Sequence, residues 1–371
     1  MNKVEGVRYS YLAQQFNDCD DLWQKLKEFV KTGDFTLGEE LKKFEMSFAD
    51  LIGTKYAVGV NSGTDAIKLS LKALGVGHGD EVITAANTFV ATVGAINELG
   101  AIPVFVDCNK TFCMDVSQVR GKITKNTKSI LPVHFSGYMT NMPELMEIAA
   151  EFNLPVVEDA CQGILASIDG KNSGTWGITG AFSLHPLKNI NVWSDGGVIV
   201  TDDEKIYKEL LLLRNHGLSG RDTVEILAFN SRLDTFQAIV GSWLLPQANE
   251  IANKRISNAA ILDNGLREIP GISLPERRLN EKIVYHLYMF RAENRDSLLK
   301  HLRDNNVEAK VHYPIPIYRQ KALSYLGNVE GDFPQSDEDA ANLISLPCDQ
   351  HLSIQELNYM IQKIRDFYSR N

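Results

Sequence analysis

Two residues, Lys188 and Asp159, are of types and at positions in the sequence that could support chemistry at a carbonyl group. Lys188 follows the apolar run 181–184, and Ser183 and His185 precede it. A lysine amine acts as a Schiff-base nucleophile when burial or a neighbouring cation lowers its pKa. Asp159 ends another apolar run, where a buried carboxylate requires a cation or several donors. Alternatives stay open, because most lysines are exposed and acidic residues often cap helices.

A third feature, Ser62-Gly63-Thr64, stands where a strand-like apolar run meets a helical pattern. The first turn of a helix carries unpaired N–H groups and a partial positive charge, so it can bind a phosphate. Gly63 would let the backbone approach such a ligand, and Thr64 would offer a hydroxyl. The segment can equally be an ordinary helix cap, for which serine and threonine are favoured.

These features become specific in combination, because all of them follow predicted strands of one sheet. Together they predict a site for pyridoxal 5'-phosphate (PLP). The phosphate would lie at 62–64 and Ser183, the protonated pyridine nitrogen at Asp159, and the aldehyde carbon at Lys188. Phe89 also follows a strand end and would cover the ring, unless it is an ordinary core residue.

The elements that must position these residues alternate between strands and helices. Short apolar runs between turn residues predict strands, and apolar residues three and four positions apart predict helices. Such alternation implies a mostly parallel sheet with helices on both faces, whose ligands lie beyond the carboxyl ends of the strands. The predicted strands are 56–60, 81–84, 102–106, 129–133, 155–158, 181–184 and 198–201, and the predicted helices include 67–74, 89–99, 142–152 and 204–214.

Two adjacent acids, Glu158 and Asp159, stand together at the end of one predicted strand. Side chains alternate along a strand, so these two are expected to point to opposite faces of the sheet. One of them could therefore face a ligand while the other pairs elsewhere.

The pattern changes after about residue 250, where a smaller α+β unit is expected. Helices are predicted there at 256–266, 297–305 and 354–368, and a strand at 284–290. A length of 371 residues is consistent with two domains. We therefore expect an N-terminal arm, a large ligand-binding domain and a small C-terminal domain. Their predicted ranges are 1–35, 36–250 and 251–371.

The composition argues against several classes of protein. There are 38 Lys and Arg residues against 47 Asp and Glu residues, a net charge of −9, which disfavours nucleic acid or an anionic membrane as a partner. The five cysteines are scattered without a C-x-x-C pair, so neither a metal site nor a disulfide framework is predicted. The start of the sequence lacks the apolar core of a signal peptide, and no stretch is long and apolar enough to span a bilayer. The expected location is the cytoplasm.

Several segments, in their order and spacing, resemble the DegT/DnrJ/StrS family of PLP-dependent sugar aminotransferases. The resemblance runs from about Gly33 to the C-terminus. It implies PLP-dependent aminotransferase fold type I, an α/β fold with a large, mostly parallel sheet domain and a smaller α+β C-terminal domain. The matching segments are Thr36-Leu37-Gly38, Asn61-Ser62-Gly63-Thr64-Asp65-Ala66, Gly79-Asp80-Glu81-Val82-Ile83, Thr88-Phe89-Val90-Ala91-Thr92, Pro132-Val133-His134, Glu158-Asp159-Ala160-Cys161-Gln162, His185-Pro186-Leu187-Lys188-Asn189, Asp195-Gly196-Gly197, Arg214-Asn215-His216-Gly217 and Asn230-Ser231-Arg232-Leu233-Asp234.

The resemblance implies a role for each matching position. Lys188 would form the Schiff base with the cofactor, and Asp159 would pair with the pyridine nitrogen. Gln162 would contact the hydroxyl side of the ring, and Phe89 would stack on the ring. The phosphate would be held by Ser62, Gly63, Thr64 and Ser183, and by Asn230 from a neighbouring subunit.

The same resemblance implies a homodimeric aminotransferase with shared active sites. It would move an amino group from L-glutamate to a keto-sugar through pyridoxamine phosphate. Lys188 would be the base at the donor's α-carbon and then the acid at the cofactor carbon, while the protonated ring absorbs the electrons. The expected setting is amino-sugar or cell-surface polysaccharide biosynthesis, including that of lipopolysaccharide.

One segment departs from the family pattern, and it bears on the acceptor. Members commonly have a glycine-rich stretch after the lysine, where this chain carries 189–197 with Trp193. Similar forms are associated with acceptors that lack a nucleotide, including a 3-keto-hexose phosphate and the 8-keto derivative of Kdo that gives 8-amino-3,8-dideoxy-octulosonate. A nucleotide-linked keto-sugar stays open. Trp193 could instead pack at a subunit contact, and 312–316 could be a proline-rigidified loop. The residues expected at the sugar are His185, Trp193, His312 and Tyr313.

Three other functions stay open on the sequence. A PLP-dependent sugar dehydratase of the same fold replaces the lysine by histidine, whereas this chain has Lys188 and no cysteine cluster for an iron–sulfur centre. A non-catalytic PLP-binding regulatory protein would keep the pocket without turnover, although no basic helix-turn-helix segment accompanies it. The acceptor could also be an amino acid or a cyclitol.

Overall fold

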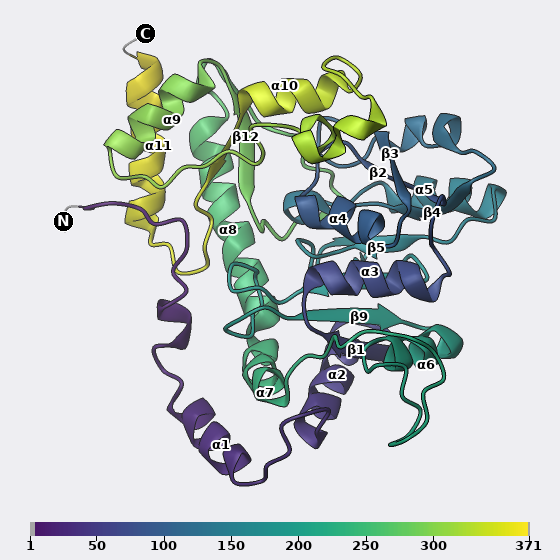
Figure 1. Ribbon diagram of the computed structural model, residues 1–371. Coiled ribbons are helices and arrows are strands. Elements are labelled where there is room, and N and C mark those ends of the chain that lie inside the picture. The colour runs from purple at the N-terminus through teal and green to yellow at the C-terminus, as the bar shows by residue number, and fades with distance from the viewer. Residues whose placement is uncertain (1–3, 370–371) are drawn as a thin grey trace.

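The structure, a computed structural model, describes residues 4–369, and its central feature is a sheet in the order β1-β9-β8-β5-β4-β2-β3 (Figure 1). The sheet consists of a four-stranded part and a three-stranded part. Two parallel bridges where β4 lies beside β5, Ile130–Val156 and Val133–Asp159, join the two parts. The strands are β1 (Tyr56–Val60), β2 (Glu81–Ala85), β3 (Ile102–Val106), β4 (Thr127–Leu131), β5 (Val157–Asp159), β8 (Thr179–Ser183) and β9 (Gly197–Thr201).

All neighbouring strands of this sheet run parallel except those that pair with β9, which is antiparallel to β1 and to β8. The mostly parallel sheet expected from the sequence is therefore confirmed. The two strands predicted at 56–60 and 102–106 have these bounds, and the other ends shift by no more than two residues. The apolar runs predict these strands well because their side chains are buried on both faces of the sheet.

Helices cover both faces of the sheet, and two hydrophobic clusters show which helices share a face. Phe48 and Phe182 lie in one cluster, and Ile67 and Ile199 lie in the other. In β1, β2, β4, β8 and β9, adjacent residues contribute to opposite clusters, as the period of a strand requires. The first layer contains α2 (Glu39–Ile52), α5 (Met142–Glu151) and α7 (Thr235–Leu244), and the second contains α3 (Gly63–Ala73), α4 (Val90–Glu98) and α6 (Glu204–Leu213).

The C-terminal part is a smaller α+β unit beside the sheet (Figure 1). Its antiparallel sheet has the order β10-β12-β13, and it shares a hydrophobic cluster with three helices. A further small antiparallel sheet, β11-β6-β7, joins the two parts of the molecule. In it β11 of the C-terminal part pairs with β6, and β6 pairs with β7; both β6 and β7 lie between β5 and β8 in the chain. The elements are β6 (Ser167–Ile168), β7 (Lys171–Asn172), α8 (Ala248–Leu266), β10 (Ile272–Ser273), β11 (Glu281–Lys282), β12 (Tyr288–Ala292), α9 (Arg295–Asp304), α10 (Pro334–Asn342), β13 (Leu343–Leu346) and α11 (Ile354–Ser369).

The strand predicted at 284–290 is shifted, because β12 begins only at Tyr288. The preceding residues hydrogen-bond to other parts of the chain instead. The Val284 N–H donates to the Gly137 carbonyl, and the Tyr285 carbonyl accepts from Arg255. The sequence run 284–290 is mostly apolar and aromatic, so its pattern alone could not show that these long-range hydrogen bonds replace strand pairing in its first half. The predicted helix at 256–266 likewise begins earlier, at Ala248.

The N-terminal segment packs along both parts of the molecule. Val7 forms a parallel bridge with Val307 in the C-terminal part, and α1 (Asp20–Val30) packs against α7. A boundary at residue 250 would fall inside the long helix α8, so the three-part division stays a prediction. No helix among residues 4–369 has the length and apolarity that crossing a membrane requires.

Candidate active site

A cavity of about 300 Å³ lies where β1, β5 and β8 end, closed on the other side by residues 286–287 and 312–313. It has the position that ligands take in open α/β sheets, beyond the carboxyl ends of the strands. The structure thus brings most of the predicted site residues to one place. The predicted residues that line it are Ser62, Gly63, Thr64, Phe89, Asp159, Gln162, Ser183, His185, Lys188, His312 and Tyr313.

The start of α3 forms one wall of the cavity. Ser62 is the N-cap, and its Oγ accepts the Asp65 N–H at 3.1 Å, so the capping interpretation is correct for this side chain. The N–H groups of Gly63 and Thr64 belong to the first turn, where no intrahelical acceptor exists. A Cβ atom on Gly63 would lie 2.7 Å from Ser183 Cβ and 2.9 Å from Cys161 Sγ. Only glycine therefore lets the helix start approach Ser183 closely enough to form one anion cradle.

Glu158 and Asp159 point to opposite faces of the sheet, as predicted from their adjacency. Glu158 is fully buried away from the cavity, 2.8 Å from His134 Nε2, and it accepts backbone N–H groups at 174, 176 and 177. Asp159 faces the cavity. Its Oδ2 accepts from the Thr92 hydroxyl at 2.8 Å, and its Oδ1 accepts the Cys161 N–H at 3.2 Å. Asp159 therefore keeps an oriented carboxylate at the cavity wall.

Lys188 lines the same cavity as Asp159, so its side chain does not point into bulk water. Burial lowers the pKa of the Lys188 amine, although Cys161 and Asp159 act in the opposite direction. Burial also raises the pKa of the Cys161 thiol well above its usual range, so the thiol is neutral. A lowered pKa increases the neutral fraction of the amine, which nucleophilic attack on an aldehyde requires.

Two histidines on the far side of the cavity stay uncharged at neutral pH. Burial lowers the pKa of His312 to about 4, and it lowers the pKa of His286 well below the usual range. The positive charge of Lys188, which lines the same cavity, contributes to both shifts. Neutral imidazoles can accept as well as donate hydrogen bonds, so they suit the hydroxyl groups of a polar ligand.

Aromatic and amide groups complete the cavity. Phe89 is half exposed at the cavity wall, with its ring centroid 6.0 Å from that of Tyr313. Gln162 accepts the Ser136 N–H through Oε1 at 2.7 Å, which fixes the amide and leaves its NH2 group as a donor. Phe89 is therefore not an ordinary core residue, and its exposed face is available to a planar ring.

Two predicted site residues lie outside the cavity of their own chain. Trp193 packs in an aromatic cluster, with ring centroids 5.6 Å from Phe16 and 5.2 Å from Trp23. Asn230 is exposed and forms an isolated antiparallel bridge with Asn215. The packing of Trp193 is thus intramolecular, and neither residue lines the cavity of its own chain.

The sequence did not single out Thr92 or His286, which also line the cavity. Thr88 and Thr92 are four residues apart, and their hydroxyl oxygens are 2.7 Å apart at the start of α4. That helical spacing next to Phe89 was a usable signal. His286 had none, because it lies in the run that was predicted as a strand.

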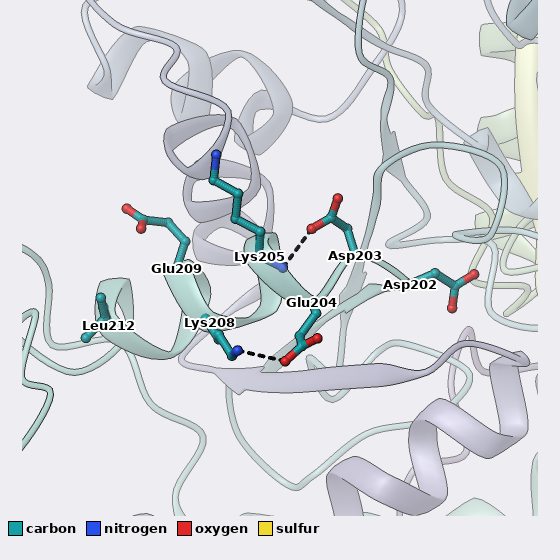
Figure 2. A pocket seen from close by; sticks show the side chains of 7 residues that line it. All are labelled: Asp202, Asp203, Glu204, Lys205, Lys208, Glu209 and Leu212. Carbon is teal, nitrogen blue, oxygen red and sulfur yellow. Dashed lines mark hydrogen bonds and ion pairs between the residues drawn. The ribbon is translucent and has the colours of Figure 1, made fainter.

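A shallower hollow of about 690 Å³ lies at the start of α6 (Figure 2). Its charged side chains serve the helix itself. Asp203 accepts the N–H groups of Lys205 and Ile206, and Lys208 pairs with Glu204 at 2.7 Å. It shares no lining residue with the cavity at Lys188, so it contributes nothing to the chemistry there. No cluster of potential metal ligands occurs among the described residues.

The residues that line the cavity match each chemical group of PLP. The free N–H groups in the first turn of α3, together with Ser183, suit a phosphate, Asp159 suits a protonated pyridine nitrogen, and Phe89 suits the face of a ring. Lys188, with its lowered pKa, suits the aldehyde carbon. These residues would hold the cofactor without any change in the fold.

Comparisons with known proteins agree with this geometry. The pleiotropic regulatory protein of Geobacillus stearothermophilus is 36% identical over 361 residues, which cover 96% of this chain and 97% of that protein. The dTDP-3-amino-3,4,6-trideoxy-alpha-D-glucose transaminase of Streptomyces venezuelae is 36% identical over 342 residues, with 92% and 90% coverage.

Two solved structures share the whole fold. DesV of S. venezuelae, in complex with a ketimine intermediate, has a TM-score of 0.96 at 34% identity and covers 99% of both chains. NtdA of Bacillus subtilis, with the bound cofactor PMP, has a TM-score of 0.93 at 30% identity and covers 99% of this chain and 86% of its own. The sequence profile of one family matches residues 18–365. The chain therefore belongs to the DegT/DnrJ/EryC1/StrS aminotransferase family.

Proposed function

We propose that this protein, a PLP-dependent sugar aminotransferase, transfers the amino group of L-glutamate to a keto-sugar. The observation that carries the proposal is the shared cavity of Lys188 and Asp159, in which burial lowers the pKa of the lysine amine. The acceptors to be tested first are an 8-keto derivative of Kdo, a 3-keto-hexose phosphate and a nucleotide-linked keto-sugar. The sugar transaminase of S. venezuelae among the relatives supports this class of substrate.

Each site residue is assigned one task in this proposal. Lys188 holds the cofactor and moves a proton between its Nζ atom and the reacting carbon atoms. Asp159 keeps the pyridine nitrogen protonated, Gln162 donates to the ring hydroxyl, and Phe89 orients the ring. The first turn of α3 and Ser183 hold the phosphate. When bound, PLP supplies the electron sink that makes the α-carbon of an amino acid acidic.

The subunit arrangement proposed is a homodimer in which Asn230 reaches the phosphate site of the partner subunit. Its own chain leaves Asn230 exposed, and Leu227 in the same segment is 93% exposed. His185, His312 and Tyr313 line the cavity and are assigned to the sugar, whereas Trp193 packs outside the cavity and is not.

The deciding experiment supplies the purified protein with L-glutamate and a panel of keto-sugars. Release of 2-oxoglutarate and the mass of the aminated product identify the donor and the acceptor. We expect catalytic turnover with at least one keto-sugar and none in the Lys188→Ala variant. Full turnover by Lys188→Ala would contradict the assignment of this lysine.

A second candidate function is regulatory, because the relative from G. stearothermophilus is a pleiotropic regulatory protein. A protein with this role would keep the cofactor cavity without needing repeated turnover. One stoichiometric amino transfer followed by no further product would favour this role over the enzymatic one.

A further inference from the structure

A second compartment, of about 90 Å³, adjoins the main cavity on the side of the C-terminal part. The two share Leu187, His286, Leu287 and His312 in their walls, so a ligand at Lys188 can extend into it. Its volume suits a few water molecules or one small polar group rather than a sugar ring. Distant parts of the chain build its other walls, which include Tyr9, Ser10, Arg255, Lys310, Cys348 and Asp349.

The charge of this compartment favours an anion. Two cationic residues, Arg255 and Lys310, and one carboxylate, Asp349, line the compartment. The other titratable groups are uncharged at neutral pH, because burial lowers the pKa values of His286 and His312 and raises the pKa of the Cys348 thiol to about 12. The cations therefore outnumber the anions at neutral pH. An anionic group that enters from the main cavity would meet a positive potential.

Asp349 and Arg255 are already occupied with the protein itself. The Asp349 carboxylate accepts the N–H groups of Tyr11 at 3.2 Å and His351 at 3.0 Å. Arg255 donates to Gln350 and to the Tyr285 carbonyl, and it lies 3.6 Å from Asp349. These hydrogen bonds fix the Asp349 and Arg255 side chains in the wall of the compartment. A positive charge that is free to bind a ligand must therefore come from another residue.

Lys310 is that residue. Its Nζ atom lies 4.2 Å from the centroid of the Tyr9 ring, and no carboxylate lies within 4 Å of it in the described part of the chain. Its backbone is fixed by two hydrogen bonds to Ser345. Lys310 is exposed, so its ammonium is available both to solvent and to an anion in the compartment that it lines.

Two buried polar atoms of the compartment's walls also lack partners. The Tyr9 hydroxyl and His286 Nδ1 are buried, and neither has a partner with good hydrogen-bond geometry among the described residues, although Ser345 lies close enough to the Tyr9 hydroxyl to affect its pKa. Such atoms cost free energy unless water or a ligand satisfies them. Burial keeps the pKa of Tyr9 well above its usual range, so the hydroxyl is a donor at neutral pH.

We propose that this compartment is an oxyanion subsite, which binds a carboxylate or phosphate group of a substrate whose reacting carbon lies at Lys188. The group would accept hydrogen bonds from Tyr9, His286 and Lys310. The inference rests on the proposed function, because it requires that both substrates use the cavity. The anion comes either from L-glutamate or from an acidic acceptor, and the two half-reactions distinguish these sources.

The kinetic test measures each half-reaction separately by the absorbance change of the bound cofactor. Lys310→Met removes the charge, Lys310→Arg retains it, and Lys300→Met is the matched control on the exposed face of α9. We expect Lys310→Met to raise KM about tenfold for the substrate that carries the anion, with kcat changed less than twofold. The increase appears with glutamate if the donor occupies the subsite, and with an acidic but not a neutral keto-sugar if the acceptor does.

A binding test does not depend on turnover. Inorganic phosphate is titrated calorimetrically into the PLP-loaded protein, whose phosphate cradle is already filled. Lys310→Met and Tyr9→Phe should weaken its binding about tenfold, while Lys310→Arg and Lys300→Met should not. Unchanged KM values in both half-reactions, together with unchanged phosphate binding, would overturn the subsite. Inactivity of the wild type with glutamate and every keto-sugar would instead refute the proposed function, and the phosphate titration would still test the subsite.

Discussion

The Thr92 hydroxyl donates a hydrogen bond to the Asp159 carboxylate, with 2.8 Å between Thr92 Oγ1 and Asp159 Oδ2. Both side chains are buried, and the two residues are 67 positions apart in the chain. Thr92 is itself 2.7 Å from the Thr88 hydroxyl, so the first turn of α4 orients a carboxylate at the end of β5. The cofactor site thus depends on a contact between the helix that follows β2 and the end of β5, which is two strands away in the sheet.

Replacing Thr92 by valine keeps the shape of the side chain but removes this donor. A hydrogen bond to a charged group contributes about 1.5–3 kcal/mol, so we expect PLP to bind the Thr92→Val protein roughly tenfold or more weakly. Titration of the apoprotein with PLP, followed by absorbance, measures the effect. Thr92→Ser retains the hydroxyl and should bind nearly as the wild type does. Equal affinities of the valine and serine variants would contradict the orienting role of Thr92.

The glycine at the start of α3 should be indispensable for holding the phosphate. A Cβ atom at this position would lie 2.7 Å from Ser183 Cβ, so Gly63→Ala must push the helix start away from Ser183. We expect at least a tenfold loss of PLP affinity with little change in helix content, measured by titration and far-UV circular dichroism.

The control for this change is Gly94→Ala, in α4, where a Cβ atom would meet nothing within 4 Å. Alanine is favoured over glycine inside a helix, so this variant should be as stable as the wild type or more stable. If both alanine variants bound PLP like the wild type, close approach at residue 63 would not matter.

Lys188 should reduce the stability of the apoprotein at neutral pH. Burial lowers its pKa in the folded state below the ordinary value of a lysine, about 10.5, so the unfolded state binds the proton more tightly. The free-energy cost of burying the charged Lys188 amine applies in full below its pKa in the folded state. It disappears as the pH rises toward 10.5, because stability increases with pH where the unfolded state holds more protons.

Lys188→Met should therefore raise the melting temperature of the apoprotein at pH 7 by about 1–3 °C, and the gain should shrink as the pH rises through the folded pKa toward the ordinary value of a lysine. Differential scanning calorimetry of both apoproteins across this range checks the sign. A gain that stayed constant with pH would show that packing, rather than the buried charge, causes it.

Glu158 should contribute to stability, although it is next to the site. It is fully buried, lies 2.8 Å from His134 Nε2 and accepts three backbone N–H groups of the 174–177 turn. Glu158→Gln replaces one acceptor oxygen by a donor, so a buried N–H loses its partner. We expect a loss of about 3 kcal/mol in the free energy of unfolding, measured by urea denaturation.

The exposed Glu276 offers the matched control, because Glu276→Gln should change the free energy of unfolding by less than about 0.5 kcal/mol. If the Glu158 variant were as stable as this control, the buried network around His134 would not stabilise the fold. PLP affinity should change less in Glu158→Gln than in Thr92→Val, since Glu158 faces away from the cavity.

Local patterns in the sequence determined the strands, the start of α3 and the opposite directions of Glu158 and Asp159. These features depend on residues close together in the chain, through side-chain periodicity and helix capping. The common edge of parallel strands then implied that 62–64, Asp159 and Lys188 meet. The structure places them in one cavity.

Only the tertiary structure decided which distant residues complete that cavity. His286 lies in a run that was predicted as a strand, Tyr9 comes from the N-terminal segment, and Thr92 reaches Asp159 from another helix. Trp193, expected at the sugar, packs against Phe16 instead. Side-chain period and capping depend on near neighbours, whereas these contacts depend on how separate elements pack, and no local pattern specifies that packing.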